Sequence, residues 1–159
     1  MPYGDISIRK AEAPEARLAR LNTELRDASA QTVLRVAMVR EWRDSLTYVS
    51  SFGAESVAML ALIADVKPDL PIIFLETGMH FPQTLDYKAE LIEKLGLTGV
   101  RDIPPSETER KVLDPKNNLW KTDPDACCAM RKVRPLEPAL EGFDAWITGR
   151  KRFHGGARM

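Results

Sequence analysis

A turn rich in hydroxyl groups lies between an apolar strand-like run and an apolar helix-like run within residues 46–60. Small residues let the main chain approach an anion closely, and the first turn of a helix offers N–H groups that no helix carbonyl accepts. Serine hydroxyls add further donors. The turn therefore predicts a phosphate or sulfate site, whose candidate residues are Ser50, Ser51, Phe52, Gly53, Ala54, Glu55 and Ser56.

This motif also has a plain structural interpretation. Any turn between a strand and a helix favours Ser and Gly. The segment has neither the Gly-Lys-Ser/Thr of a Walker A loop nor a G-x-G-x-x-G fingerprint. The anion site thus depends on what the rest of the chain supplies.

The chain has two cysteines, Cys127 and Cys128, and they are adjacent. A trans peptide holds their Cα atoms about 3.8 Å apart, closer than the roughly 4.4–6.8 Å of unstrained disulfides. Arg131 and Lys132 follow one helical turn later and place positive charge beside the sulfurs, which suits thiolate ligands. Two interpretations stay open, buried unreactive thiols or metal ligands; a zinc site is disfavoured because the two histidines lie on separate segments.

Composition limits the classes of partner. Lys plus Arg and Asp plus Glu number 23 each, so no net field attracts the chain to nucleic acid or to a membrane surface. Residues 131–159 nevertheless carry seven basic and three acidic side chains, which suits a small anion. Residues 1–10 contain no apolar signal segment, and the longest apolar run, 57–64, is too short to span a bilayer. We expect a cytoplasmic protein.

These candidates must be positioned by alternating strands and helices. Apolar runs predict strands at 46–49, 72–75, 97–103 and 145–148, with helices after the first two strands, the second of these at about 82–95. The pattern predicts an α/β fold with a mostly parallel sheet and flanking helices, whose ligand site lies at the carboxyl ends of the strands. Segments 50–56, 76–78 and 148–152 fall there.

Three further segments complete the expected organisation. Residues 14–42 should form packing helices that break near Ser29, and residues 126–140 a helix interrupted by Pro135 and Pro138. Residues 104–125 should form a long polar connection, functional or mobile. We expect N-terminal packing helices in 1–44 and the unit that carries the candidate anion site in 45–159, within one globular body.

Four blocks in this order resemble one family. They are Ser-Ser-Phe-Gly-Ala-Glu-Ser at 50–56, Leu-Glu-Thr-Gly-Met-His-Phe-Pro-Gln-Thr at 75–84, Cys-Cys-Ala-Met-Arg-Lys-Val-Arg-Pro-Leu at 127–136 and Ala-Trp-Ile-Thr-Gly-Arg-Lys-Arg at 145–152. The chain resembles the adenylyl-sulfate branch of the assimilatory adenylyl-sulfate and phosphoadenylyl-sulfate reductases. The resemblance implies an adenine-nucleotide α-hydrolase-like fold, with 50–56 as its modified pyrophosphate-binding loop (PP-loop).

The same resemblance implies roles for single residues. Main-chain groups of Leu75 and Gly149 match positions that hold the adenine, Lys132 matches a lysine near the phosphosulfate, and Arg158 matches a basic position bordering the active site. The candidate substrate-binding set is completed by Thr77, Gly78 and Arg150.

Cofactor and partners also follow from the resemblance. Paired cysteines such as Cys127 and Cys128 ligate a four-iron four-sulfur cluster together with a downstream Cys-x-x-Cys, and the nucleophile is a cysteine in a C-terminal Glu-Cys-Gly-x-His motif. Residues 1–159 contain neither motif, so no catalytic residue is assigned and we expect an incomplete form of the enzyme. The implied ligands are adenylyl sulfate and AMP, the implied electron donor is of thioredoxin or glutaredoxin type, and a homo-oligomer is left open.

Alternative functions remain at this point. A phosphoadenylyl-sulfate reductase differs only in its substrate, and the paired cysteines alone favour adenylyl sulfate. An ATP pyrophosphatase usually carries Ser-Gly-Gly-x-Asp-Ser, where this chain has Phe52 and Glu55 in place of Gly and Asp. A non-catalytic nucleotide-binding module is the third possibility.

Overall fold

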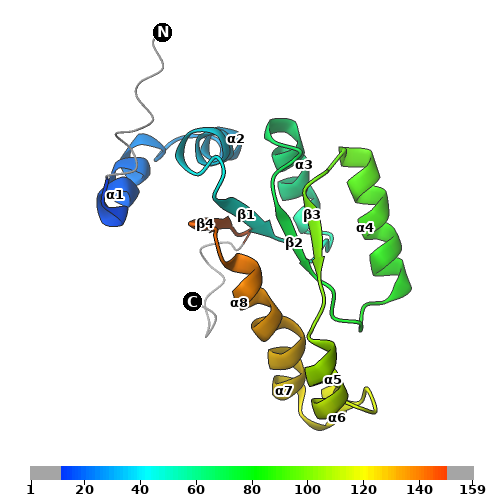
Figure 1. Cartoon of the computed structure of the whole chain (residues 1–159). Helices are drawn as coiled ribbons and strands as arrows, with labels where there is room; N and C mark the ends of the chain where they lie inside the picture. Colours follow the sequence, from blue (N-terminus) through cyan, green and yellow to red (C-terminus); the bar gives the residue numbers. More distant parts are fainter. Residues whose placement is uncertain (1–11, 150–159) are drawn as a thin grey trace.

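A single parallel sheet organises the computed structural model, which describes residues 12–149. Four strands within this range, β1 (Leu46–Val49), β2 (Ile72–Leu75), β3 (Val100–Ile103) and β4 (Ala145–Ile147), are arranged in the order β3-β2-β1-β4 (Figure 1). Tyr48 pairs with both Ile72 and Ile147, in the parallel sense on each side. The predicted α/β class is confirmed.

The chain crosses the sheet in two directions. The connections from β1 through α3 (Ser56–Val66) to β2, and from β2 through α4 (Pro82–Leu95) to β3, move the chain one way across the sheet. The return from β3 to β4 passes beyond β1. Right-handed crossovers then place α3 and α4 on one face and the returning helices on the other. Of these helices, α8 (Arg134–Leu140) contacts β2 and β3.

Apolar runs at the predicted positions form the core. β2 is buried over its first three residues, as expected for a continuous apolar strand in a parallel sheet. α4 begins with Pro82 in its first turn and ends at Gly96, whose φ of 63° is the left-handed conformation that glycine tolerates. The largest buried apolar side chains are those of Met38, Phe52, Leu60, Ile63, Leu70, Ile72, Ile73, Phe74 and Met130.

The N-terminal helices break where the sequence predicts. α1 (Pro14–Glu24) is followed by α2 (Ala30–Arg35), which continues into the π-helical turn η2 (Val36–Glu41). Ser29 precedes α2, and its hydroxyl accepts a hydrogen bond from the N–H of Thr32. Ion pairs join the two pieces, with Arg40 and Glu24 2.5 Å apart. The division of the chain near residue 45 into packing helices and a nucleotide-binding unit stays a prediction.

The predicted long connection at 104–125 is wrong in one respect, because helices occupy most of it. They are α5 (Glu107–Leu113), α6 (Leu119–Thr122) and α7 (Pro124–Cys128). Ser106 and Asp123 each accept a hydrogen bond from the first turn of the following helix, and the buried Asp114 accepts the N–H groups of Asn118 and Leu119. Side-chain caps thus stabilise helices too short and polar to show apolar periodicity. Two strands are also shorter than predicted, since β3 begins at Val100 and β4 ends at Ile147.

The predicted interruption of the helix at 126–140 is confirmed next to Pro135 but is wrong for Pro138, which lies inside α8 (Arg134–Leu140). α7 leads into a second π-helical turn, η3 (Ala129–Val133), before α8. The N–H of Arg134 bonds to the carbonyl oxygen of Ala129, five residues earlier. Pro135 explains this geometry, because it has no N–H and its ring would clash with a carbonyl four residues back in a regular α-helix. Among residues 12–149 no helix combines the length and apolar character that a membrane span requires.

Candidate functional site

The three predicted site segments meet at one edge of the sheet. Residues 50–56, 76–78 and 148–149 follow the carboxyl ends of β1, β2 and β4. β1 leads on to β2 on one side of it, whereas β4, its neighbour on the other side, is reached by the crossover from β3. The strand order therefore reverses at β1, which makes the ends of β1 and β4 a topological switch point. Open parallel sheets bind ligands at such a point.

Hydrogen bonds within the loop after β1 leave two N–H groups available. The N–H groups of Phe52 and Gly53 donate to the hydroxyls of Ser50 (3.1 Å) and Ser51 (3.4 Å). The N–H of Ser56 donates to the carbonyl oxygen of Gly53 at 2.8 Å. Within the described range, the N–H groups of Ala54 and Glu55 have no hydrogen-bond acceptor. Both precede α3, so the loop offers two open donors at a helix N-terminus, an arrangement that suits an anion.

The buried side chain of Phe52 fixes this loop to the core. Its side chain has no exposed surface and its ring meets that of Phe74 with centroids 5.7 Å apart. Its backbone has a φ of 53°, a left-handed conformation that is unusual for a residue with a side chain. With its N–H bonded to Ser50 and its ring in the core, Phe52 sets the path of the loop. Its contact with substrate stays a prediction.

In the turn after β2, side chains accept hydrogen bonds from main-chain N–H groups of the same turn. Glu76 accepts the N–H of Gly78 at 2.8 Å, and the Thr77 hydroxyl accepts the N–H of Met79 at 3.2 Å. Gly78 has a φ of 69°. The carbonyl oxygen of Leu75 lies 3.0 Å from the ring nitrogen Nε2 of His80. The turn is thereby held in one shape at the edge of the switch point.

Arg131, which the sequence indicated only as positive charge beside the cysteines, is bonded to the turn after β2. It is 2% exposed, and its guanidinium donates to the carbonyl oxygen of Thr77 (2.6 Å), to the carboxylate of Asp114 (2.7 Å) and to the side chain of Asn117 (2.7 Å). Burial raises the pKa of the Asp114 carboxyl, but hydrogen bonds from Arg131 and from two N–H groups outweigh it and hold that pKa below the ordinary value. No local pattern in the sequence marks Arg131 as buried. The three residues that follow it, Lys132, Val133 and Arg134, are exposed.

The cysteine pair and Lys132 lie on the same interrupted helix as Arg131. Cys127 is buried, Cys128 is half-buried and both are free thiols, while Lys132 is exposed. A four-iron cluster takes four cysteine thiolates. The two sulfurs fit half of such a ligand set, and the described residues contain no group of three or more His, Cys, Asp or Glu side chains placed to hold a metal ion.

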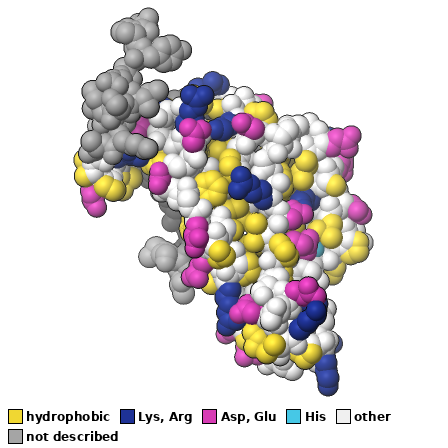
Figure 2. Space-filling view, in the orientation of Figure 1, with side chains coloured by type: hydrophobic (Ala, Val, Ile, Leu, Met, Phe, Trp, Pro, Cys, Tyr) yellow, Lys and Arg dark blue, Asp and Glu magenta, His cyan; other side chains and the backbone are white. Residues whose placement is uncertain are grey.

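The remaining predicted residues lie at or beyond the end of the described range. Gly149 is exposed, and a Cβ atom added to it would lie 4.0 Å from the hydroxyl of Tyr48. Arg150 and Arg158 lie outside the described residues. On the face shown in Figure 2, basic and acidic side chains of the described residues are interspersed rather than gathered in a block of one sign.

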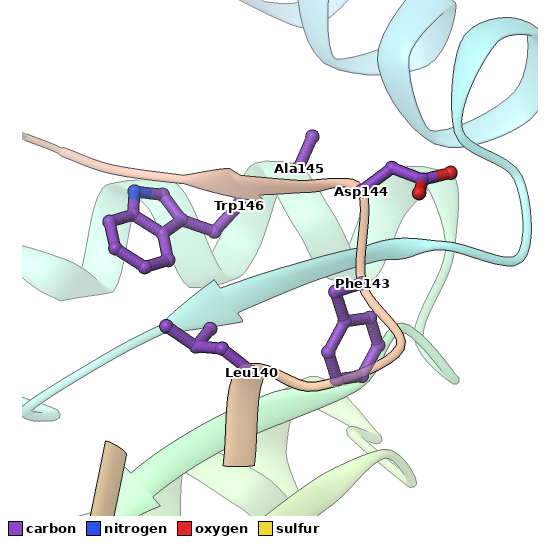
Figure 3. Close-up of a pocket in the computed structure, with 5 residues that line it drawn as sticks. All are labelled: Leu140, Phe143, Asp144, Ala145 and Trp146. Carbon is purple, nitrogen blue, oxygen red and sulfur yellow. The ribbon is translucent and has the colours of Figure 1, made fainter. Parts of the chain in front are cut away.

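A pocket of about 410 Å³ lies elsewhere, around the amino end of β4. Figure 3 shows the residues that line it: Leu140, Phe143, Asp144, Ala145 and Trp146. Ligands of parallel sheets bind at the opposite, carboxyl ends of strands. This pocket is therefore separate from the candidate site.

Comparison with known proteins places the chain in one family. The family model for the phosphoadenosine phosphosulfate reductase domain matches residues 45–159. The chain is 45% identical over 117 residues to the adenosine 5'-phosphosulfate reductase of Mesorhizobium japonicum, covering 74% of this chain and 46% of the relative. It is 40% identical over 132 residues to that of a Chelativorans species, covering 82% and 54%.

A solved structure supports the same assignment. The crystal structure of phosphoadenylyl-sulfate reductase from Candida auris, a phosphate complex, superposes with a TM-score of 0.72 at 29% identity, covering 88% of this chain and 69% of that one. The chain spans about half the length of the curated relatives that it matches. With a domain match over residues 45–159, an α/β fold shared with a solved reductase and the predicted motifs at one edge of the sheet, the chain belongs to the phosphoadenosine phosphosulfate reductase domain family.

Proposed function

We propose that this chain forms the nucleotide-binding part of an adenylyl-sulfate reductase, an enzyme of sulfate assimilation that reduces adenylyl sulfate to sulfite and AMP. The observation that carries the proposal is the pair of open N–H groups at Ala54 and Glu55, at the switch point of a sheet in this family. Curated relatives named adenosine 5'-phosphosulfate reductase support the choice of substrate.

In this proposal the chain's residues bind and orient the phosphosulfate. The N–H groups of Ala54 and Glu55, with the N-terminus of α3 behind them, donate hydrogen bonds to one anionic group. Lys132 supplies positive charge that offsets the repulsion between an anionic nucleophile and the sulfate. Main-chain groups of Leu75 and Gly149 hold the adenine ring.

The proposed reaction is a two-step transfer at sulfur. A cysteine thiolate attacks the sulfate sulfur, the bond from sulfur to the phosphate oxygen breaks, and AMP leaves with the electron pair. A donor thiol then attacks the cysteine sulfur of the S-sulfocysteine, which releases sulfite and leaves a mixed disulfide between enzyme and donor. A second donor thiol attacks the donor sulfur of that bond, forms the donor disulfide and releases the enzyme cysteine as a thiolate. Sulfur is reduced by two electrons and two thiols are oxidised. The resemblance assigns the attacking thiol to a Glu-Cys-Gly-x-His motif that residues 1–159 do not contain.

Cys127 and Cys128 have a separate role in the proposal, as two of the four thiolates of a four-iron four-sulfur cluster. Their position suits this role, because two adjacent free thiols in one helix cannot form an unstrained disulfide. They are half of a ligand set, and no step of the proposed reaction passes through the cluster. The proposal also includes a cytoplasmic location and an electron donor of thioredoxin or glutaredoxin type, which the resemblance to the reductase family implies.

Phosphoadenylyl sulfate is the second candidate substrate. The solved structure from Candida auris is named for it, and its match covers 88% of this chain. Substrate choice depends on whether the site accepts a 3′-phosphate.

Calorimetric titration of the chain with AMP, adenylyl sulfate, phosphoadenylyl sulfate and ATP tests the proposal. We expect adenylyl sulfate to bind at least tenfold more tightly than its 3′-phosphorylated form. The reverse order would favour the second candidate. Absence of binding by a folded chain, as judged by circular dichroism, would overturn the nucleotide-binding role, and pyrophosphate release from ATP would indicate an ATP pyrophosphatase instead.

A further inference from the structure

The turn after β2 is joined to β3 at its start, where the N–H of Glu76 donates to the carbonyl oxygen of Ile103 at 3.0 Å. Its exposed residues, Gly78 and Met79, donate only to the side chains of Glu76 and Thr77 within the turn itself. The carbonyl oxygen of Thr77 points the other way and accepts a hydrogen bond from Arg131, 54 residues later in the chain. This bond joins the turn to the helix that carries Cys127, Cys128 and Lys132.

The guanidinium that holds the turn is itself held from the other side. One of its terminal nitrogens donates to both Asp114 and Asn117. The second carboxylate oxygen of Asp114 accepts the N–H groups of Asn118 (2.7 Å) and Leu119 (3.0 Å), so the carboxylate cannot rotate freely. A continuous set of hydrogen bonds therefore runs from the start of α6 through Asp114 and Arg131 to Thr77.

Burying the charged side chains of Arg131 and Asp114 costs free energy, because both lose their contact with water. Arg131 is 2% exposed and Asp114 is 1% exposed, and the Nε of Arg131 has no partner among the described residues. A buried ion pair is often no more stabilising than apolar residues of similar volume, so stability does not account for this one. What the pair does here is hold the turn and the helix in one arrangement. The planar fork of arginine reaches Thr77 and Asp114 at once, which the single ammonium of lysine cannot reproduce.

The guanidinium also lies next to Gly78, the last residue of the turn. A Cβ atom added to Gly78 would lie 3.6 Å from the guanidinium nitrogen that bonds Thr77, and Gly78 has a φ of 69°. Lys132 follows Arg131 directly on η3. The turn and the helix are thus joined at the point where both approach the carboxyl ends of the strands.

We infer that Arg131 is a positioning residue for nucleotide binding, which acts by fixing the Glu76–Gly78 turn through the carbonyl oxygen of Thr77. It does not touch the ligand, and Asp114 and Asn117 hold it in place. The part of the inference that concerns affinity rests on the proposed function. The part that concerns the turn does not.

The test measures the turn and the ligand separately. In Arg131→Lys we expect amide hydrogen exchange at residues 76–79 to speed up more than tenfold while exchange in β2 is unchanged, and the affinity for AMP to fall about tenfold. Arg134→Lys is the matched control: Arg134 lies three residues later, is exposed and pairs with Glu109 at 2.6 Å, and should change neither readout. Asn117→Gly is a milder second variant, because glycine adopts the φ of 53° found there, and should shift both readouts in the same direction.

Each result decides the matter. Unchanged exchange at 76–79 in both Arg131→Lys and Asn117→Gly would overturn the inference, as would an equal rise of exchange in β2, which would reveal general destabilisation. Faster exchange confined to the turn with unchanged AMP affinity would also overturn it as a positioning role. If the unaltered chain binds no AMP, the proposed function fails, and exchange alone decides whether Arg131 fixes the turn.

Discussion

The ring of Phe52 meets the ring of Phe74 edge-on, with an interplanar angle of 80°, while the Phe52 backbone adopts a left-handed φ of 53°. A left-handed conformation costs a residue with a Cβ about 1–2 kcal/mol. Full burial of a Phe side chain contributes roughly 1.5–3 kcal/mol. The contact in the core therefore offsets the backbone strain, and it fixes the loop whose N–H groups form the candidate anion site.

This relationship predicts an unusual order of stabilities at position 52. Phe52→Ala should lose about 3–5 kcal/mol, because it removes the ring and keeps a Cβ in the left-handed region. Phe52→Gly should be more stable than Phe52→Ala by about 1 kcal/mol, since glycine has no such penalty. Urea unfolding followed by circular dichroism measures both.

Leu60 provides the matched control for this pair. It is fully buried in the middle of α3, where glycine is about 1 kcal/mol worse than alanine. The order of the Ala and Gly variants should therefore reverse between positions 60 and 52. The same order at both positions would contradict the strain at Phe52.

Local patterns were sufficient to predict most of the fold. The strands at 46–49 and 72–75 and the helix at 82–95 have the predicted bounds, because apolar runs, Pro82 and Gly96 mark them without help from distant residues. The short helices after β3 escaped prediction because they have no apolar stripe. Their only local signals are the capping residues Ser106 and Asp123.

The position of the site could be predicted from the sequence, but the hydrogen bonds and backbone conformations within it could not. Strand order brings the predicted segments to one edge of the sheet, since parallel strands end together. The burial of Arg131 depends on Asp114 and on the carbonyl oxygen of Thr77, which lie 17 and 54 residues away in the chain. The left-handed backbone at Phe52 depends likewise on the ring of Phe74, 22 residues away in the chain.

Lys132 offers a direct test of charge at the candidate site. Lys132→Ala should weaken adenylyl sulfate binding more than tenfold, because it removes a positive charge proposed to lie near the phosphosulfate. Calorimetry at low ionic strength measures the change. Lys94→Ala is the control, since Lys94 is exposed on α4 and pairs with Glu90. Equal affinity of the Lys132→Ala chain and the unaltered chain would remove this role.

Asp114 predicts a pH dependence of stability. Its pKa is lower in the folded chain than in the unfolded chain, so its ionised form stabilises the fold above about pH 4 and this contribution is lost as pH falls through the folded value. Asp114→Asn should therefore lose less free energy of unfolding than the unaltered chain when pH is lowered from about 5 to about 3. Urea titrations across this range measure the two slopes. Asp65→Asn, at an exposed position of α3, should keep the original slope; a similar slope in Asp114→Asn would contradict the assignment.

Gly99 predicts a loss of stability without a loss of binding. A Cβ atom at this position would lie 2.1 Å from the carbonyl oxygen of Leu70, so Gly99→Ala must move main chain on the side of the sheet formed by β2 and β3. Overpacking of this kind costs about 1–3 kcal/mol. The control is Gly149→Ala, whose nearest contact would be 4.0 Å away and which should unfold like the unaltered chain.

Because Gly99 lies at the amino end of β3 and the candidate site lies between the carboxyl ends of β1 and β4, nucleotide affinity measured below the unfolding transition should survive in Gly99→Ala. A loss of affinity in proportion to the loss of stability would mean that the site depends on the far edge of the sheet.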